Sequence, residues 1–127
     1  MNNLRKEILQ ASQGEIAVIS PDKATGRYLF PPGFIGFSGH FPGHSVVPAF
    51  VQVLSAIIVV EKWKSLQLQL VKIEKAKLHI ELRPGQEITV LCRELEVKNV
   101  SPVIEVKLHV AEGLAASFLV HVKPGQV

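Results

Sequence analysis

The stretch Phe34–Trp63, FIGFSGHFPGHSVVPAFVQVLSAIIVVEKW, decides how the rest of the chain is interpreted. Its first half is rich in glycine and proline and carries two histidines, His40 and His44. Proline fixes φ at about −65°, and glycine permits backbone angles closed to other residues, so this segment is expected to have a defined shape. We therefore predict a rigid loop that presents a histidine beside the start of a helix.

A long apolar run follows the loop. Pro48 suits a first helical turn, because its missing N–H has no helical partner there. From Ala49 to Trp63 nothing interrupts a helix, and apolar residues lie on almost every side. A helix with no polar stripe has to be surrounded by other structure. The run is shorter than the ~20 residues of a membrane-spanning helix and contains Gln52 and Ser55, so we expect a buried helix and no membrane span.

The chain before the loop predicts one short helix and two short strands. Helical spacing of apolar residues places the helix near Leu4–Leu9. The strands are expected at Glu15–Ser20 and Gly26–Phe30, with a turn at Pro21–Thr25 between them. The only aspartate, Asp22, lies in that turn and is interpreted as turn-forming.

A long strand is predicted after the buried helix, at Leu70–Leu82. Apolar residues alternate with charged residues and histidine over positions 76–82, the period-2 pattern of a half-buried sheet. Val71 and Ile73 have the opposite parity, so a bulge or bend is expected near Glu74–Lys75. Three more strands and three turns complete the chain: strands at Ile88–Val97, Ile104–Val110 and Leu114–Val122, and turns at Arg83–Gln86, Asn99–Pro102 and Glu112–Gly113.

These elements favour one architecture. Short turns join antiparallel neighbours, and a sheet with one apolar face can bury both that face and an apolar helix by curling around the helix. The prediction is an α+β hotdog fold, a curled antiparallel sheet of about five to six strands around one long buried helix, as a single domain over residues 1–127. Because one curled sheet leaves an edge strand and an incompletely covered helix, we expect a dimer.

Composition narrows the function classes. The formal net charge is +3, and no run of Lys and Arg with interleaved aromatic residues indicates nucleic-acid binding. The single cysteine, Cys92, excludes an internal disulfide and is interpreted as core packing. The N-terminus lacks the continuous apolar stretch of a secretory signal, so a cytoplasmic protein is expected. Three basic residues are interpreted as solvated surface side chains: Lys62, Lys64 and Arg93. The alternative is that they contact an acidic carrier protein.

The five histidines fall into two groups. Three lie on the polar phase of predicted strands and are expected at the surface. The other two, His40 and His44, have a spacing that suits a metal only on a helix, but Pro42 and Gly43 interrupt a helix and no third ligand is near. We therefore predict no metal and no cofactor. The three surface histidines are His79, His109 and His121.

Two interpretations of His40 stay open from the residues alone. It can be a structural histidine that hydrogen-bonds the loop backbone, or a general base, because a neutral imidazole titrates near working pH. The free N–H groups of a helix that starts after Pro48 can hold a carbonyl oxygen that gains negative charge.

The loop resembles a known family. The motif Gly39-His40-Phe41-Pro42-Gly43-His44, followed by Val47-Pro48, is similar to the signature of the 3-hydroxyacyl-[acyl carrier protein] dehydratases, and the element order agrees over roughly Gly26–Lys123. The resemblance implies removal of water from a 3-hydroxyacyl thioester without metal or nucleotide. It implies that His40 takes a proton from C2 and that the Ala49 amide binds the thioester carbonyl, with Gly39, Phe41 and Pro48 at the same substrate-binding loop. It also implies an apolar acyl tunnel at a dimer interface.

The sequence departs from this family at two positions. Ala49 replaces the glycine after the proline, and Leu54 stands fourteen residues after His40, where the family has a Glu or Asp that protonates the departing hydroxyl. Glu61 shares the helix face of Leu54 but lies about 10 Å further along at 1.5 Å per residue. Gln52 occupies a position that is also polar in the family, but its amide cannot act as an acid. His44 is the best local candidate for the missing acid.

Three functions are therefore weighed. The first is a dehydratase, or a related lyase or hydratase, with His40 as base and an acid not identified from the sequence. The second is a hotdog protein that binds acyl thioesters or acyl carrier protein, or pairs with an active subunit, without catalysis. The third is a hotdog thioesterase, which the dehydratase loop disfavours. The expected partner is an acyl thioester on acyl carrier protein or coenzyme A, and the expected assembly is a homodimer or a higher oligomer.

Overall fold

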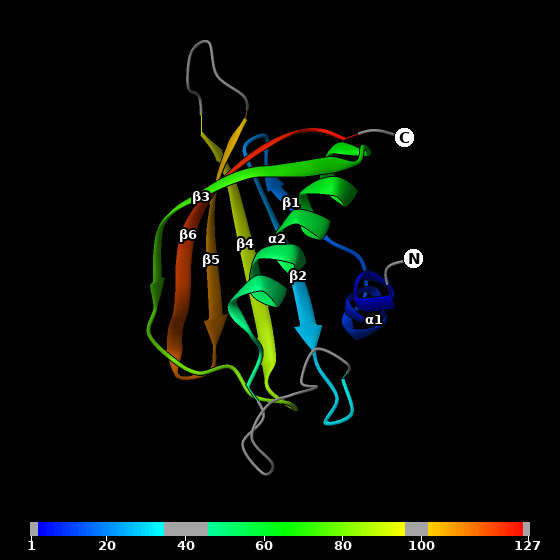
Figure 1. Ribbon diagram of the computed structural model, residues 1–127, viewed down its shortest axis with the longest axis vertical. Helices are drawn as coiled ribbons and strands as arrows, with labels where there is room; N and C mark the ends of the chain where they lie inside the picture. Colours follow the sequence, from blue (N-terminus) through cyan, green and yellow to red (C-terminus); the bar gives the residue numbers. More distant parts are fainter. Residues whose placement is uncertain (1–2, 35–45, 96–101, 126–127) are drawn as a thin grey trace.

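The computed structural model describes residues 3–34, 46–95 and 102–125. Within these ranges the chain forms two helices and six strands (Figure 1). In chain order they are α1 (Asn3–Ala11), β1 (Ala17–Ser20), β2 (Lys23–Leu29), α2 (Ala49–Lys64), β3 (Leu68–Leu78), β4 (Glu87–Leu95), β5 (Val103–Val110) and β6 (Gly113–Pro124). Neither described helix is both long and apolar enough to cross a bilayer.

The six strands form one antiparallel sheet in the order β1-β2-β4-β5-β6-β3. Figure 1 shows this sheet curling around α2, which confirms the predicted hotdog fold. Alternation along the strands supplies the inner face, because every second residue of β5 and β6 is buried. Those side chains and most of α2 share one core cluster.

The long helix packs closely on the sheet at Gly26 of β2. A Cβ added to Gly26 would lie 2.7 Å from Cγ2 of Val59 on α2, so any larger residue would force the Val59 side chain to shift. At its C-terminal end α2 stops at Ser65, whose φ of 55° is left-handed and whose backbone N–H donates to the Glu61 carbonyl. The positive charges of Lys62 and Lys64 in the last turn interact favourably with the negative end of the helix dipole and so stabilise this end of α2.

The predicted strand Leu70–Leu82 is partly wrong. Strand β3 spans Leu68–Leu78, and the expected bulge is confirmed by a register shift between Glu74 and Lys77 and by the φ of 53° at Lys75. The predicted half-buried pattern fails, however, because Ala76 is exposed and Leu78 is 60% exposed. The physical reason is the position of β3 at an edge of the sheet, where it pairs with β6 on one side only.

The connection after β3 is a second correction. A short turn was expected to make β3 and β4 neighbours, but β3 pairs with β6 at the far edge of the sheet. Residues 79–86 instead cross the open end of the curled sheet (Figure 1). Four backbone hydrogen bonds hold the crossing. Two join it to the chain around α2, from Val47 N–H to Leu82 O at 2.7 Å and from Gly85 N–H to Phe30 O at 2.9 Å, and two run from the N–H groups of residues 79 and 80 to the Ala115 carbonyl. This crossing brings the β3–β4 segment to the start of α2.

The structure also tests the predictions for the cysteine and for the surface histidines. Cys92 is fully buried in the core as predicted, and burial raises the pKa of its thiol to about 12. His79 is exposed as predicted, whereas His121 is only half-buried and its Nε2 lies 2.5 Å from Oε1 of Glu74 on the neighbouring strand. That hydrogen bond holds the pKa of Glu74 below its usual value. Residues 96–101, which include most of the turn expected at Asn99–Pro102, lie outside the described part of the chain.

Candidate functional site

The Gly39–His44 part of the motif that carries the family resemblance lies outside the described residues. Gly39, His40, Phe41 and His44 all fall within positions 35–45. The described chain resumes at Val46 and leads directly into α2, so the site is built here from the helix start and from what surrounds it.

The first turn of α2 has backbone N–H groups that find no acceptor within the helix. Pro48 caps the helix with φ −63° and ψ 155°, and its carbonyl accepts hydrogen bonds from the N–H groups of Val51 and Gln52, at 3.0 and 3.1 Å. The N–H groups of Ala49 and Phe50 come before these bonds and have no acceptor within the helix. Ala49 is exposed, and its N–H donates no backbone hydrogen bond to any residue in the described part of the chain. The positive end of the helix dipole strengthens the electrostatic attraction between this donor and a carbonyl oxygen.

A pocket of about 250 Å³ lies at this helix start. One wall is formed by residues 46–49 and Gln52, and the opposite wall by residues 78–82 at the end of β3 and in the crossing segment. Most of the lining residues are apolar, and Gln52 is the polar residue among those on the helix side. The pocket therefore combines an apolar surface with a helix-start donor, an arrangement that suits an acyl chain ending in a carbonyl.

Gln52 is the polar side chain buried most deeply in this pocket. It is only 6% exposed, and its Nε2 donates to the backbone oxygen of Val47 at 3.1 Å. Its Oε1 is buried and has no hydrogen-bond partner among the described residues. A buried acceptor without a partner costs free energy, so its presence in a native fold calls for an explanation. The sequence identified Gln52 only as a polar position that cannot act as an acid.

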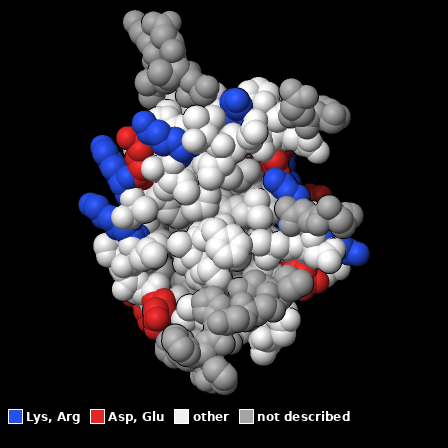
Figure 2. Space-filling view, in the orientation of Figure 1, with Lys and Arg blue, Asp and Glu red and all other residues white. Residues whose placement is uncertain are grey.

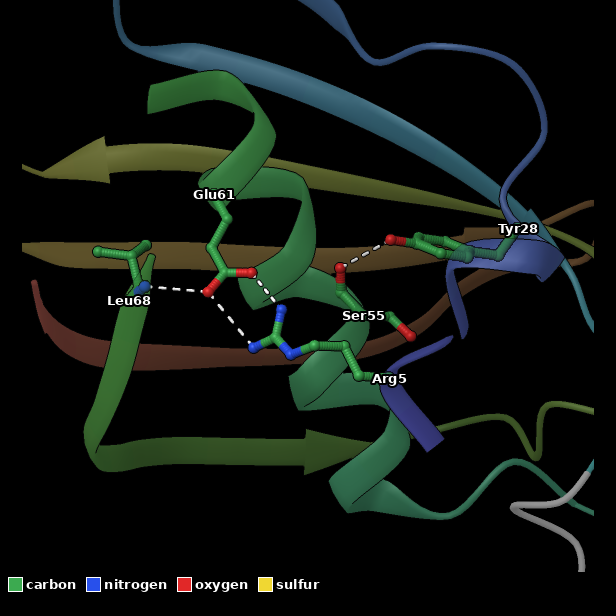
Figure 3. Close-up of polar contacts among 5 residues, drawn as sticks. All are labelled: Arg5, Tyr28, Ser55, Glu61 and Leu68. Carbon is green, nitrogen blue, oxygen red and sulfur yellow. Dashed lines mark hydrogen bonds and ion pairs between the residues drawn. The ribbon is translucent and has the colours of Figure 1, made fainter. Parts of the chain in front are cut away.

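Leu54 occupies the position of the missing helix acid and is half-buried against the core. The neighbouring hydroxyl of Ser55 does not replace a carboxylate, because Oγ donates to the Val51 carbonyl at 2.7 Å inside the helix. The Ser55 carbonyl in turn accepts a hydrogen bond from the Tyr28 hydroxyl at 3.0 Å (Figure 3). Burial raises the pKa of that phenol well above its usual value.

Glu61 has a structural role at the other end of α2. Its carboxylate forms a two-point ion pair with the Arg5 guanidinium of α1 and accepts the backbone N–H of Leu68 at 2.9 Å (Figure 3). The Glu61 side chain is only 12% exposed. These contacts tie α1, the end of α2 and the start of β3 together. They occupy both carboxylate oxygens, which excludes the alternative that Glu61 substitutes for the acid at Leu54.

Replacing Glu61 by alanine is expected to lower the free energy of unfolding by about 1–3 kcal/mol, because the Leu68 N–H loses its acceptor and the ion pair between Glu61 and Arg5 is removed. Chemical denaturation measures this change. The matched control is Glu94→Ala, which removes a more exposed pair with Lys64 at 2.8 Å and should cost at most about 1 kcal/mol. Equal losses in the two variants would contradict the role assigned to Glu61.

Two titratable side chains on the pocket were missed by the sequence reasoning. His79 and Glu81 line its far wall, and Glu81 also accepts a hydrogen bond from Arg83 at 3.2 Å. Strand alternation predicted only that His79 is at the surface, and nothing in the local pattern placed this segment beside α2. Within the described ranges, no three His, Cys, Asp or Glu side chains gather as a metal site.

Comparison with known proteins agrees with this architecture. Residues 17–117 match the family model of ApeI-like proteins, described as ApeI dehydratase. The ApeI:P dehydratase heterocomplex from Xenorhabdus doucetiae is similar in structure, with a TM-score of 0.73 and 17% identity over 85% of this chain and 93% of that chain. E. coli PaaI, from the phenylacetic acid degradation operon, has a TM-score of 0.64 and 10% identity over 85% of this chain and 80% of that one.

A third similar structure is an HP0420 homologue from Helicobacter felis, with a TM-score of 0.65 and 18% identity over 89% of this chain and 78% of that one. No curated protein matches the sequence. Structural likeness at these identities shows the fold, whereas the family model covers most of the chain. The helix-start pocket, the hotdog architecture and the match over residues 17–117 together establish that this chain belongs to the ApeI-like dehydratase family.

Proposed function

We propose that this protein binds 3-hydroxyacyl thioesters in the pocket at the start of α2 and begins their dehydration there. The observation that carries the proposal is the position of Ala49, the first residue of α2, among the residues that line a mainly apolar pocket. A thioester carbonyl bound to this donor gains negative charge when C2 loses a proton, and a preorganised N–H stabilises that charge. The acyl chain is then accommodated by the apolar walls.

His40 is proposed as the base that takes the C2 proton. Its position in the sequence, nine residues before Ala49, connects it by a short loop to the pocket. A neutral imidazole titrates near working pH, which suits reversible removal of a proton next to a carbonyl. Gly39, Phe41 and Pro48 are proposed to shape the same loop around the thioester.

The proton for the departing hydroxyl must come from a group other than Leu54. His79 and Glu81 are the described titratable side chains on the pocket, and a partner subunit is the other proposed source. The apolar side chain at Leu54 also favours a second candidate function, in which the protein holds acyl thioesters for an active partner and does not complete the elimination itself.

We propose that β3 forms the interface with a partner subunit. It is an edge strand with exposed apolar side chains on both parities, and Phe50 of α2 is 59% exposed. Figure 2 shows few charged side chains in the centre of the face that carries α2. A homodimer is the proposed assembly, with a heterodimer as the alternative because the similar ApeI:P structure is a dehydratase heterocomplex. The thioester carrier is proposed to be acyl carrier protein or coenzyme A. The exposed large apolar residues of β3 are Leu70, Val71, Ile73 and Leu78.

The test is an assay of the wild-type protein on short and medium-length 3-hydroxyacyl thioesters. Absorbance of the enoyl thioester reports dehydration, a thiol reagent reports thioester cleavage, and light scattering on the same sample gives the mass of the assembly. Enoyl formation supports the dehydratase, and binding without product supports the second candidate. Release of thiol as the main reaction, or failure to bind any acyl thioester, would overturn the proposal.

A further inference from the structure

The amide of Gln52 is fixed in one orientation. The Val47 carbonyl is an acceptor, so the atom 3.1 Å from it must be the Nε2 donor, and the opposite end of the amide must be the oxygen. That oxygen, Oε1, is buried and unpartnered among the described residues, and Gln52 is one of the residues that line the pocket at the start of α2. A residue of the pocket wall thus carries a buried acceptor whose orientation is set by the protein.

An unpaired acceptor selects for a donor in the ligand. A saturated acyl chain and a thioester carbonyl contain no hydrogen-bond donor, whereas a hydroxyl group donates one hydrogen bond. A buried site that can pair with a hydroxyl discriminates against an analogue without it, because the site's own polar group is then left unpaired. The Ala49 donor and the Gln52 acceptor both lie on the first turn of α2, which suits a ligand with a carbonyl and a nearby hydroxyl.

We propose that Gln52 is the specificity-determining residue of this pocket and that its Oε1 accepts a hydrogen bond from the 3-hydroxyl of the acyl group. The inference rests on the proposed function, because it assumes that the pocket takes acyl thioesters. It goes further by assigning the selection of hydroxylated over non-hydroxylated chains to one atom. Gln52 orients the hydroxyl and moves no proton itself, since an amide is neither acid nor base at working pH.

The experiment compares two ligands that differ only in the donor. Each is an acyl pantetheine with an amide in place of the thioester, which keeps the carbonyl but suppresses elimination, and each carries either a hydroxyl or a fluorine at C3. Calorimetry gives the affinity of each ligand for the wild type and for Gln52→Leu, Gln52→Met and Gln52→Glu. The wild type should prefer the hydroxyl ligand by about 3- to 10-fold, the effect of one net hydrogen bond.

The variants separate hydrogen bonding from packing. Gln52→Leu and Gln52→Met keep an apolar side chain of similar size and should reduce the preference to about one, while Gln52→Glu still offers an acceptor oxygen and should retain it. Gln10→Leu on the exposed face of α1 is the control and should keep the wild-type ratio. The leucine and methionine variants both remove the acceptor, so either one tests the inference if the other fails to fold.

Three results would overturn the inference. Equal wild-type affinity for the two ligands would show that the pocket does not recognise the hydroxyl, while leaving acyl binding intact. A loss of affinity for both ligands in Gln52→Leu would show that Oε1 bonds a group they share, such as an amide N–H of the pantetheine. Binding of neither ligand by the wild type would overturn this inference together with the proposed function.

Discussion

Replacing His40 by alanine is expected to slow exchange of the C2 protons of a bound acyl thioester by about 10²–10⁴-fold, the usual contribution of a general base. Exchange in heavy water isolates the base, because it needs the carbonyl donor and a proton acceptor but no acid at Leu54. A saturated acyl thioester is the substrate of choice, since it has no hydroxyl to eliminate. Nuclear magnetic resonance follows the loss of the C2 proton signal.

Two other histidines serve as controls for this variant. His109→Ala changes a half-buried residue of β5 that does not line the pocket at the start of α2, and its exchange rate should equal that of the wild type. His79→Ala changes a residue that lines the pocket and tests whether proton transfer passes through its far wall instead. Unchanged exchange in His40→Ala, with the variant folded and still binding ligand, would show that His40 is not the base.

Introducing a carboxyl at Leu54 is expected to raise dehydration of a 3-hydroxyacyl thioester by about 10²–10⁴-fold, because it adds the general acid that the chain lacks at this position. Leu54 is half-buried, and burial favours the protonated form of a carboxyl group, which suits a proton donor. The rate of enoyl formation by Leu54→Glu, relative to the wild type, measures the gain.

The control for the gain is Leu54→Gln, which has the size and polarity of glutamate but no proton to give. It should fold as well as Leu54→Glu and show the wild-type rate. C2 exchange should be similar in all three proteins, because the change affects the acid step and not the base. If Leu54→Glu is folded and binds ligand but gains no dehydration, the acid of this protein does not belong at position 54.

The sequence predicted the architecture because two of its patterns have few structural solutions. A mainly apolar run as long as Ala49–Trp63 has to be enclosed, and strands that alternate like β5 supply one apolar face to enclose it. The wrong prediction of burial for β3 also comes from its pattern of alternation. Its side chains alternate as in a half-buried strand, but alternation does not say which neighbour a strand has, and pairing with β6 put Leu78 at an exposed edge.

The sequence predicted only the part of the site that is formed by residues close together in the chain. Pro48 and Ala49 could be placed at a helix start from the residues alone, and the structure puts them beside a pocket. The opposite wall comes from residues about thirty positions later, so the presence of His79 and Glu81 depends on the crossing between β3 and β4. The unpaired oxygen of Gln52 also depends on packing, because only the folded chain shows which of its two amide ends is satisfied.

The helix-start donor is the centre of this account, and one substitution removes it cleanly. Ala49 is the first residue of α2, where proline is structurally favourable because its missing N–H has no helical acceptor. Pro48, with φ −63° and ψ 155°, already has the extended conformation required of a residue before proline. Ala49→Pro should therefore keep the fold while deleting the hydrogen bond to the thioester carbonyl.

The decisive measurement is the rate of C2 proton exchange by Ala49→Pro, with the thermal unfolding midpoint measured on the same sample. The account predicts a rate about 10²–10³-fold below the wild type, as for the loss of one donor to a developing oxyanion, with an unchanged midpoint. A folded Ala49→Pro protein that exchanges the C2 proton at the wild-type rate would contradict the account, because the start of α2 would then have no part in binding the carbonyl.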